Sequence, residues 1–162
     1  GVQAARSVNI GCVRLTERHM ASAPATSDQI QRVEADTDAA IDTVLQSVPL
    51  EKATRAVAVA GTATTIAAAA LGLKTYDSEA INGSSISVDT VQKTAEMLRS
   101  MTREERAALG YMHPGRVDVI GAGATIYARI MTRLHEITEG NIDSVTVSEH
   151  DILDGIALSQ VR

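Results

Sequence analysis

One junction near the middle of the chain constrains the fold more than any other feature. Residues 55–60 (RAVAVA) form a short valine and alanine run that is typical of a strand, and residues 66–73 (IAAAALGL) have the composition of a buried helix. The loop that joins them contains one glycine, one alanine and three threonines: Gly61, Thr62, Ala63, Thr64 and Thr65. A strand that enters a helix through so short a loop is typical of an α/β domain.

The same loop is a candidate phosphate-binding site. The start of a helix offers free N–H groups and a positive dipole potential to an anion. Gly61 would let the backbone approach a ligand closely, and the threonine hydroxyls would bond a ligand oxygen. A simpler alternative stays open, in which Thr62 or Thr64 only caps the helix.

Length and composition indicate one globular domain with an aliphatic core. A chain of 162 residues can bury roughly 70% of its unfolded surface. Hydrophobic residues make up 44% of it and charged residues 22%, which are values of globular proteins. Because the chain has no Trp, no Phe and only three Tyr, alanine, valine, isoleucine and leucine must fill the core. Such side chains favour close packing of helices on a sheet.

Charge and cysteine content limit the partners that the chain can have. A net charge of −5 argues against a general nucleic-acid binder, whose affinity would come from a basic face. Cys12 is the only cysteine, so no intrachain disulfide or cysteine-based zinc site can form, which fits the cytoplasm; we expect a buried thiol rather than a nucleophile. No apolar run approaches the roughly 20 residues that span a bilayer, and no secretory leader opens the chain. We therefore expect no membrane partner.

The spacing of apolar residues predicts alternating strands and helices. Strands are expected over residues 2–10, 55–60 and 144–148. Helices are expected over residues 12–20, 27–48, 66–73, 88–101, 103–109, 114–139 and 149–161, and the one that begins at Pro114 is expected to be the longest. A capping box formed by Thr102 and Glu105 supports the helix at residue 103.

Two strands that are separated by long helical segments are expected to pair in parallel. In such sheets ligands bind beyond the carboxyl ends of the strands. The loop at residues 61–65 would lie at this edge, and so would Glu149, which follows the last strand. Gly121 and Gly123 fall inside a helical pattern, where each glycine costs about 1 kcal/mol relative to alanine. Close packing of the helix or contact with a ligand would offset that cost.

Four segments of the chain resemble, in order and spacing, the second domain of the Ppx/GppA family of exopolyphosphatases and guanosine pentaphosphate phosphatases. The segments are residues 7–17 (SVNIGCVRLTE), 60–65 (AGTATT), 113–123 (HPGRVDVIGAG) and 147–155 (VSEHDILDG). The resemblance implies an α/β fold of the RNase H-like type found in actin, sugar kinases and Hsp70, with a mixed sheet flanked by helices. It also implies hydrolysis of a terminal phosphoanhydride in polyphosphate or guanosine pentaphosphate, assisted by Mg²⁺.

The family pattern also contains an acidic phosphate loop, a catalytic glutamate and a second, glycine-rich phosphate loop, and these segments do not occur here. The resemblance therefore implies that residues 1–162 are one domain, the carboxyl-terminal half of a two-domain phosphatase, with no catalytic residue and no metal ligand of its own. Alone, this half is expected to be inactive. We expect residues 2–10 to be the third strand of a meander that lacks its first two strands, and the open edge to promote homodimers. The chain's own amino-terminal domain would be its natural partner.

By this resemblance, the candidate ligand-binding residues are Gly61, Thr62, Ala63, Thr64, Thr65 and Arg116, and the residues expected to line the cleft between domains are Gly121, Gly123 and Glu149. Arg116 follows Pro114 at a predicted helix start and would hold a polyanion through a forked hydrogen bond. It would alternatively form a structural ion pair with Asp118 or Glu149. The four histidines share no spacing typical of a metal site.

Two other classes of function remain open at the level of the sequence. One is a stand-alone nucleotide-binding module that uses residues 61–65 as its phosphate loop. The other is a non-catalytic oligomerisation or regulatory domain, in which the apolar helices form the interface.

Overall fold

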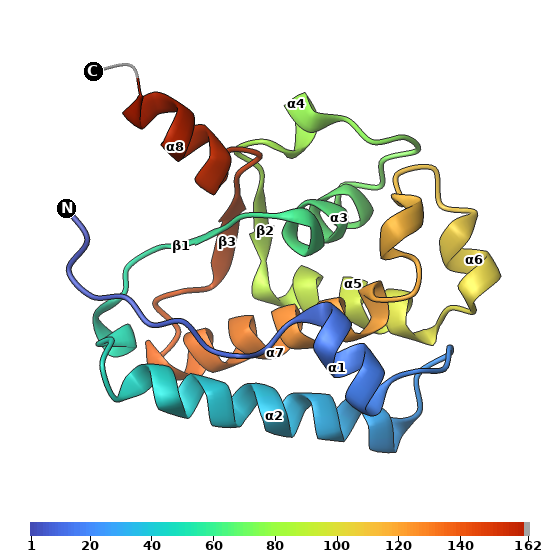
Figure 1. Ribbon diagram of the computed structural model, residues 1–162, viewed down its shortest axis with the longest axis horizontal. Coiled ribbons are helices and arrows are strands. Elements are labelled where there is room, and N and C mark those ends of the chain that lie inside the picture. The colour runs from blue at the N-terminus through green and yellow to red at the C-terminus, as the bar shows by residue number, and fades with distance from the viewer. Residues whose placement is uncertain (161–162) are drawn as a thin grey trace.

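A short mixed sheet connects the two halves of the chain in the computed structural model, which describes residues 1–160 (Figure 1). Its strands are β1 (Ala56–Ala58), β2 (Ser85–Ser87) and β3 (Ser144–Val147), in the order β1-β3-β2. β1 and β3 pair in parallel and β2 pairs with β3 in antiparallel. The parallel pair is the one that the sequence predicts, and its carboxyl edge leads into residues 61–65. These residues are the first turn of a helix rather than the predicted loop.

Helices make up most of the described chain. They are α1 (Cys12–His19), α2 (Ser27–Leu45), α3 (Gly61–Ala70), α4 (Ser78–Ile81), α5 (Val88–Ser100), α6 (Arg103–Ala107), α7 (Ile120–Ile137) and α8 (Ile152–Ser159), with short 3-10 turns η1 (Leu50–Lys52) and η2 (Pro114–Arg116). Figure 1 shows α7 lying between the sheet side of the molecule and α2, with α1 packed beside it. α7 is therefore the central element, in contact with α1, α2, α3 and α5.

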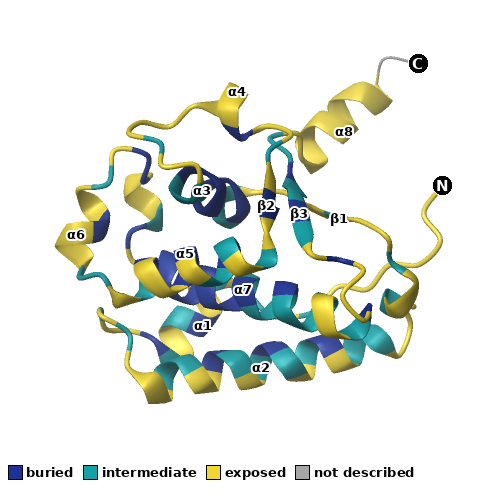
Figure 2. Ribbon diagram, turned by 180° about the vertical axis from the view of Figure 1, so that it is seen from behind, coloured by how far each residue is buried: buried dark blue, intermediate teal, exposed yellow. Residues whose placement is uncertain are grey.

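The core is aliphatic, as the composition predicts. Its larger part lies between the sheet, α3, α5 and α7 and includes Ile66, Leu98 and Val145. A second cluster lies between α1, α2 and α7, around Leu15 and Val33. Figure 2 shows the buried residues gathered on α3, α5 and α7, while one side of α2 stays exposed.

The start of several helices follows from their caps. Thr26 and Gln29 form a capping box at α2, and Thr102 and Glu105 form the predicted one at α6. At α5, the hydroxyl of Ser87 accepts a hydrogen bond from the N–H of Thr90.

Three further predictions about single elements are wrong. Residues 2–10 form no strand; they run as a largely exposed segment along the outside of the molecule, because no strand of the described residues pairs with them. Pro114–Arg116 is a separate 3-10 turn, so α7 begins only at Ile120. The longest helix among the described residues is α2, with 19 residues against 18 in α7. The predicted end of the last helix at residue 161 lies outside the described residues.

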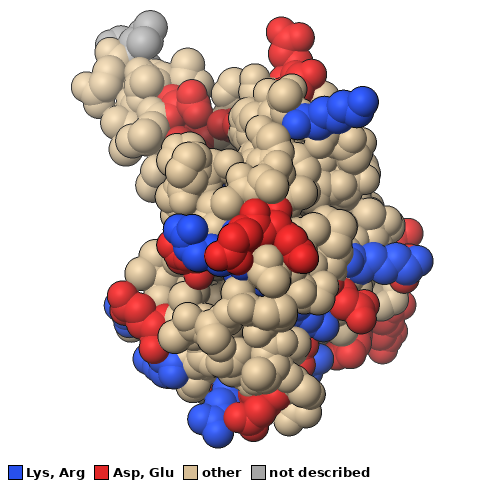
Figure 3. All heavy atoms as spheres, turned by 90° about the vertical axis from the view of Figure 1, so that its right-hand side faces the viewer, with Lys and Arg blue, Asp and Glu red and all other residues tan. Residues whose placement is uncertain are grey.

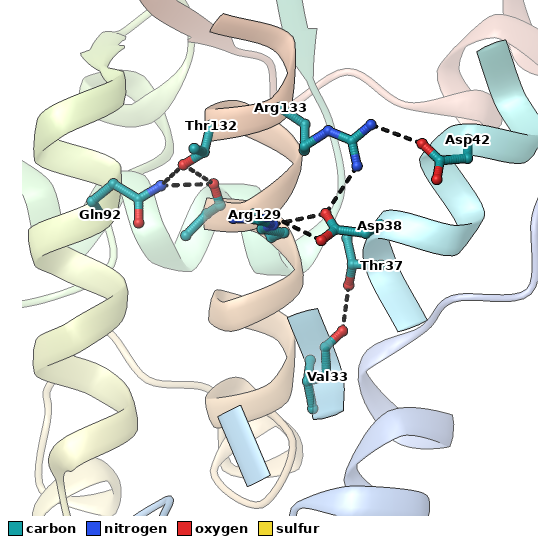
Figure 4. A network of polar contacts seen from close by, with 9 residues as sticks. Val33, Thr37, Asp38, Asp42, Gln92, Arg129, Thr132 and Arg133 are labelled. Atoms are coloured by element: carbon teal, nitrogen blue, oxygen red, sulfur yellow. Dashed lines mark hydrogen bonds and ion pairs between the residues drawn. The ribbon is translucent and has the colours of Figure 1, made fainter. Parts of the chain in front are cut away.

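A network of charged side chains fixes α2 to α7 (Figure 4). The carboxylate of Asp38 accepts hydrogen bonds from Nε and Nη2 of Arg129 at 2.7 and 2.8 Å, and from Nη1 of Arg133 at 3.1 Å. Arg133 also reaches Asp42 at 2.8 Å. These contacts hold α7, which carries Gly123 and Tyr127 toward the candidate site.

Candidate functional site

The junction between β1 and α3 leaves the start of the helix open. α3 begins at Gly61 after Ala60, whose backbone has φ 74° and ψ 177°, and no side chain caps the helix. The hydroxyls of Thr64 and Thr65 both donate to the carbonyl of Gly61, at 3.2 and 2.7 Å. The alternative in which Thr62 or Thr64 caps the helix therefore does not hold, and the first N–H groups of α3 remain available to a ligand.

Arg116 lies directly over this helix start. It comes from η2, and its guanidinium occupies the space that a Cβ at position 61 would need, so only glycine fits beneath it. No carboxylate of the described residues pairs with it: Asp118 instead pairs with Arg103 at 2.7 Å, and Glu149 accepts from Tyr76. The two structural ion pairs that the sequence left open for Arg116 are thus not formed.

Two cavities meet at Gly61 and Arg116. The larger, of about 530 Å³, lies between α3 and the segments around residues 76 and 110–116 and is lined in part by Tyr76, Tyr111 and His113. The smaller, of about 460 Å³, lies toward α1 and α7 and includes Thr62 and Gly123 in its lining. We refer to them as the tyrosine cavity and the α7 cavity. The unpaired guanidinium of Arg116 and the uncapped start of α3 together create a region of positive electrostatic potential between the two cavities.

The other predicted loop residues have different surroundings. Ala63 is 2% exposed and packs in the core, so only its backbone N–H can reach a ligand. Thr64 and Thr65 line the tyrosine cavity although both are nearly buried.

The three residues predicted to line a cleft are placed separately. Gly123 lines the α7 cavity, where a Cβ would come within 2.9 Å of Oγ1 of Thr62 and 3.2 Å of Cβ of Cys12. Gly121 lines neither cavity: it is buried beneath the guanidinium of Arg106, so close packing accounts for it. Glu149 lines neither cavity: its carboxylate accepts from Tyr76, and its backbone N–H donates to Oδ1 of Asn82 at 3.0 Å.

Sequence reasoning missed the aromatic wall of the tyrosine cavity. Tyr76 is 47% exposed, and its hydroxyl donates to the Glu149 carboxylate. Partial burial, and next the bond to Glu149, raise the pKa of Tyr76, against opposing effects of Thr64 and then Arg116. The scarcity of aromatic residues was the one sequence signal that could have identified this cavity. The chain has only three aromatic rings, and two of them, Tyr76 and Tyr111, line it.

Four further features bear on the predictions: clusters of metal ligands, the burial of Cys12, surface charge and membrane-spanning helices. Within residues 1–160, no group of three or more His, Cys, Asp or Glu side chains lies close enough to hold a metal ion. Cys12, expected to be buried, is only half-buried beside Gly123. Figure 3 shows acidic and basic side chains interspersed on the face that it draws, and no helix of the described residues is long and apolar enough to cross a membrane.

Comparison with known proteins places the chain in one family. The sequence model of the Ppx/GppA phosphatase family matches residues 1–160, which is almost the whole chain. The chain belongs to the Ppx/GppA family. The resemblance read from its four segments is confirmed.

Relatives of this Ppx/GppA chain agree with that assignment. Exopolyphosphatase 2 of Mycobacterium tuberculosis is 45% identical over 158 residues, which is 98% of this chain and 49% of the relative. The crystal structure of an exopolyphosphatase-like protein, at 41% identity, has a TM-score of 0.94 and is covered to 50%. A Ppx/GppA member from Aquifex aeolicus, at 25% identity, has a TM-score of 0.75, with 96% of this chain and 48% of the other covered.

The predicted fold class is confirmed by the same neighbours. The chain is an α/β domain with a mixed sheet flanked by helices, and its Ppx/GppA neighbours have the actin-like ATPase fold. The chain spans about half the length of the curated relatives that it matches.

Proposed function

We propose that this chain is the carboxyl-terminal domain of a phosphohydrolase that releases terminal phosphate from polyphosphate in a cleft between two domains. The family and the names of its relatives support a phosphohydrolase, and the half-length match supports a second domain upstream. One observation carries the assignment of the site. The guanidinium of Arg116, free of any carboxylate among residues 1–160, lies on Gly61 at an uncapped helix start.

This arrangement suits the electrostatic part of phosphoryl transfer. Arg116 would hold phosphate oxygens through its N–H groups, and the N–H groups of Gly61, Thr62 and Ala63 would add donors on the same side. The first turn of α3 is packed in place through the buried residues Ala63, Thr64 and Thr65, so its N–H groups require little reorganisation when a ligand binds. The proton-transfer residue would come from the other domain, and Mg²⁺ remains an expectation for the longer protein.

Guanosine pentaphosphate is a second candidate substrate, because the tyrosine cavity offers a wall for a flat ring. Tyr76 and Tyr111 line it beside Arg116, and stacking of a base on such a side chain contributes about 1–3 kcal/mol. Tyr76→Leu would then lower kcat/KM for guanosine pentaphosphate by about tenfold and leave polyphosphate hydrolysis unchanged. Equal losses for both substrates would argue against a base in this cavity.

The remaining expectations belong to the same proposal. We infer a cytoplasmic protein, consistent with a single cysteine and no spanning helix among residues 1–160. The fold and charge also favour a small anionic substrate over nucleic acid.

The deciding experiment compares this chain with the same chain joined to its upstream domain. Released phosphate is measured with polyphosphate and Mg²⁺. We expect release only from the longer protein, because catalysis at a cleft needs both walls. Turnover by the 162-residue chain alone would refute the two-domain proposal.

A loop variant tests the site itself. Thr62 lines the α7 cavity and caps nothing, so Thr62→Val in the longer protein should weaken substrate use while the melting temperature stays nearly unchanged. Thr43→Val, at a half-buried position on α2 that lines neither cavity of the site, is the matched control and should leave activity unchanged. A stability loss with normal kinetics would show that Thr62 is structural.

A further inference from the structure

His113 belongs to the candidate site, although sequence reasoning assigned no role to it. It immediately precedes η2, the turn that carries Arg116, and it lines the tyrosine cavity with Arg116. Two main-chain groups fix it: the N–H of Gly115 donates to Nδ1 of His113 at 3.0 Å, and the N–H of Arg116 donates to the carbonyl of His113 at 2.9 Å. Pro114, between them, restricts the backbone further.

The contact with Gly115 determines where the ring proton lies. A backbone N–H can only donate, so Nδ1 must accept and carries no hydrogen. In the neutral ring the hydrogen is therefore on Nε2, by assignment from this hydrogen bond. Within residues 1–160 no group accepts a hydrogen bond from Nε2, and the side chain is exposed at the cavity. His113 thus presents a free N–H donor.

We propose that His113 and Arg116 bind the same phosphate group of the ligand, with Nε2–H of His113 and the guanidinium donating to different oxygens. A phosphate has several acceptor oxygens, so it can accept from both at once. Both donors come from one short turn, and the hydrogen bonds within it fix their spacing before the ligand binds. This inference rests on the proposed function and adds a specific contact to it.

The same geometry excludes two other roles for this histidine. A general base needs a free lone pair toward the substrate, but the lone pair of the neutral ring is on Nδ1 and is occupied by Gly115. A histidine that binds a metal through Nε2 needs a lone pair on Nε2, but in the neutral ring of His113 this nitrogen carries the hydrogen. His113 is therefore a binding residue that donates a hydrogen bond, and its loss should affect substrate affinity more than the rate of the bound complex.

Two variants at this position separate binding from structure. In His113→Asn the amide oxygen can still accept from the N–H two residues later, as in an Asx turn, but the Nε2–H donor is lost. His113→Ala loses both contacts. In the protein with both domains, each variant should raise KM for polyphosphate about tenfold, with kcat nearly unchanged. Only His113→Ala should lower the melting temperature. His150→Asn, exposed and outside both cavities, is the control.

Arg116→Gln in the same protein distinguishes this inference from the proposed function. If Arg116→Gln raises KM and His113→Asn does not, the histidine contact is wrong and the proposed site stands. If neither variant changes KM, or if the wild-type protein releases no phosphate, both fail. Nitrogen-15 spectra of the imidazole rings, assigned with His113→Asn, provide an independent test. We expect hydrogen on Nε2 of His113; hydrogen on Nδ1 would overturn the proposal.

Discussion

Ala60 has a backbone conformation that residues with a Cβ rarely adopt. Its φ of 74° and ψ of 177° lie in a region that is essentially restricted to glycine. Such strain persists where the surroundings impose it, and here it turns the chain from β1 directly into α3. The strain therefore accompanies the exposed N–H groups of the candidate site.

Ala60→Gly should stabilise the protein. The substitution removes strain of about 1–3 kcal/mol at an entropic cost of about 0.5–1 kcal/mol, so the free energy of unfolding should rise by about 1 kcal/mol. Urea denaturation measures it. Ala58→Gly in β1, where φ is not positive, is the control and should destabilise the protein. A loss of stability in Ala60→Gly would mean that the turn is not strained.

Tyr127 has the one buried side-chain polar atom without a hydrogen-bond partner in the described part of the chain. Its hydroxyl is enclosed beside the α7 cavity, and burial raises the pKa of Tyr127. Tyr127→Phe should raise the free energy of unfolding by about 1 kcal/mol, because the penalty of the unpaired hydroxyl is removed. The thermal midpoint checks this. Tyr111→Phe, whose hydroxyl is not enclosed in this way, should change it little.

At the scale of residues, the structure brings together Gly61 and Arg116, which the sequence names as candidate ligand-binding residues, and their binding role stays a prediction. Gly61 and Arg116 belong to short motifs that carry their chemistry locally. Tyr76 and Gly121 do not, because their roles depend on what tertiary packing places against them: Glu149 in one case and Arg106 in the other. The spacing of residues along the chain does not predict such contacts between distant positions.

Among the elements, α2 and α7 form the pair with the most polar contacts, centred on Asp38. Hydrogen bonds from Arg129, the largest effect, and from Arg133 hold the pKa of Asp38 below its ordinary value, against a smaller opposing effect of burial. A carboxylate with a lowered folded pKa stabilises the fold above its unfolded pKa of about 3.9. That stability is lost as the pH falls through the lower, folded value.

Asp38→Asn should therefore reduce the free energy of unfolding at pH 7 by about 1 kcal/mol, a modest value because the pair is 29% exposed on both sides. The difference from wild type should shrink as the pH falls below about 4, measured by denaturation at several pH values. The control is Asp28→Asn. Its partner Arg32 is largely exposed, so this variant should reduce the free energy of unfolding by only about a few tenths of a kcal/mol. A difference that does not depend on pH would argue against the ion pair.

At the same scale, helices were predicted well and strands less so. Caps and apolar spacing mark α2, α5 and α6 within a few residues. β2 was missed, because a strand of Ser85, Ile86 and Ser87 has one apolar side chain and depends on β3 for its hydrogen bonds. Residues 2–10 show the reverse case, in which local alternation without a pairing strand forms no strand.

For the whole molecule, one side of the sheet region is apolar and uncovered. β1 is an edge strand, with Val57 56% exposed. α8 stands apart from the rest in Figures 1 and 2, and its apolar residues Ile152 and Leu153 are 76% and 70% exposed. Exposed apolar surface and a free strand edge both favour association.

We therefore expect the 162-residue chain to self-associate in solution, as light scattering over a range of concentrations would show. The predicted contact through a strand at residues 2–10 no longer applies, and α8 and the β1 edge replace it. Ile152→Ser combined with Leu153→Ser should shift the chain toward monomer, whereas Val13→Ser on the exposed face of α1 should not. Joining the upstream domain should also reduce association if that domain covers this surface. A chain that stays monomeric at high concentration would show that α8 finds a partner within its own fold.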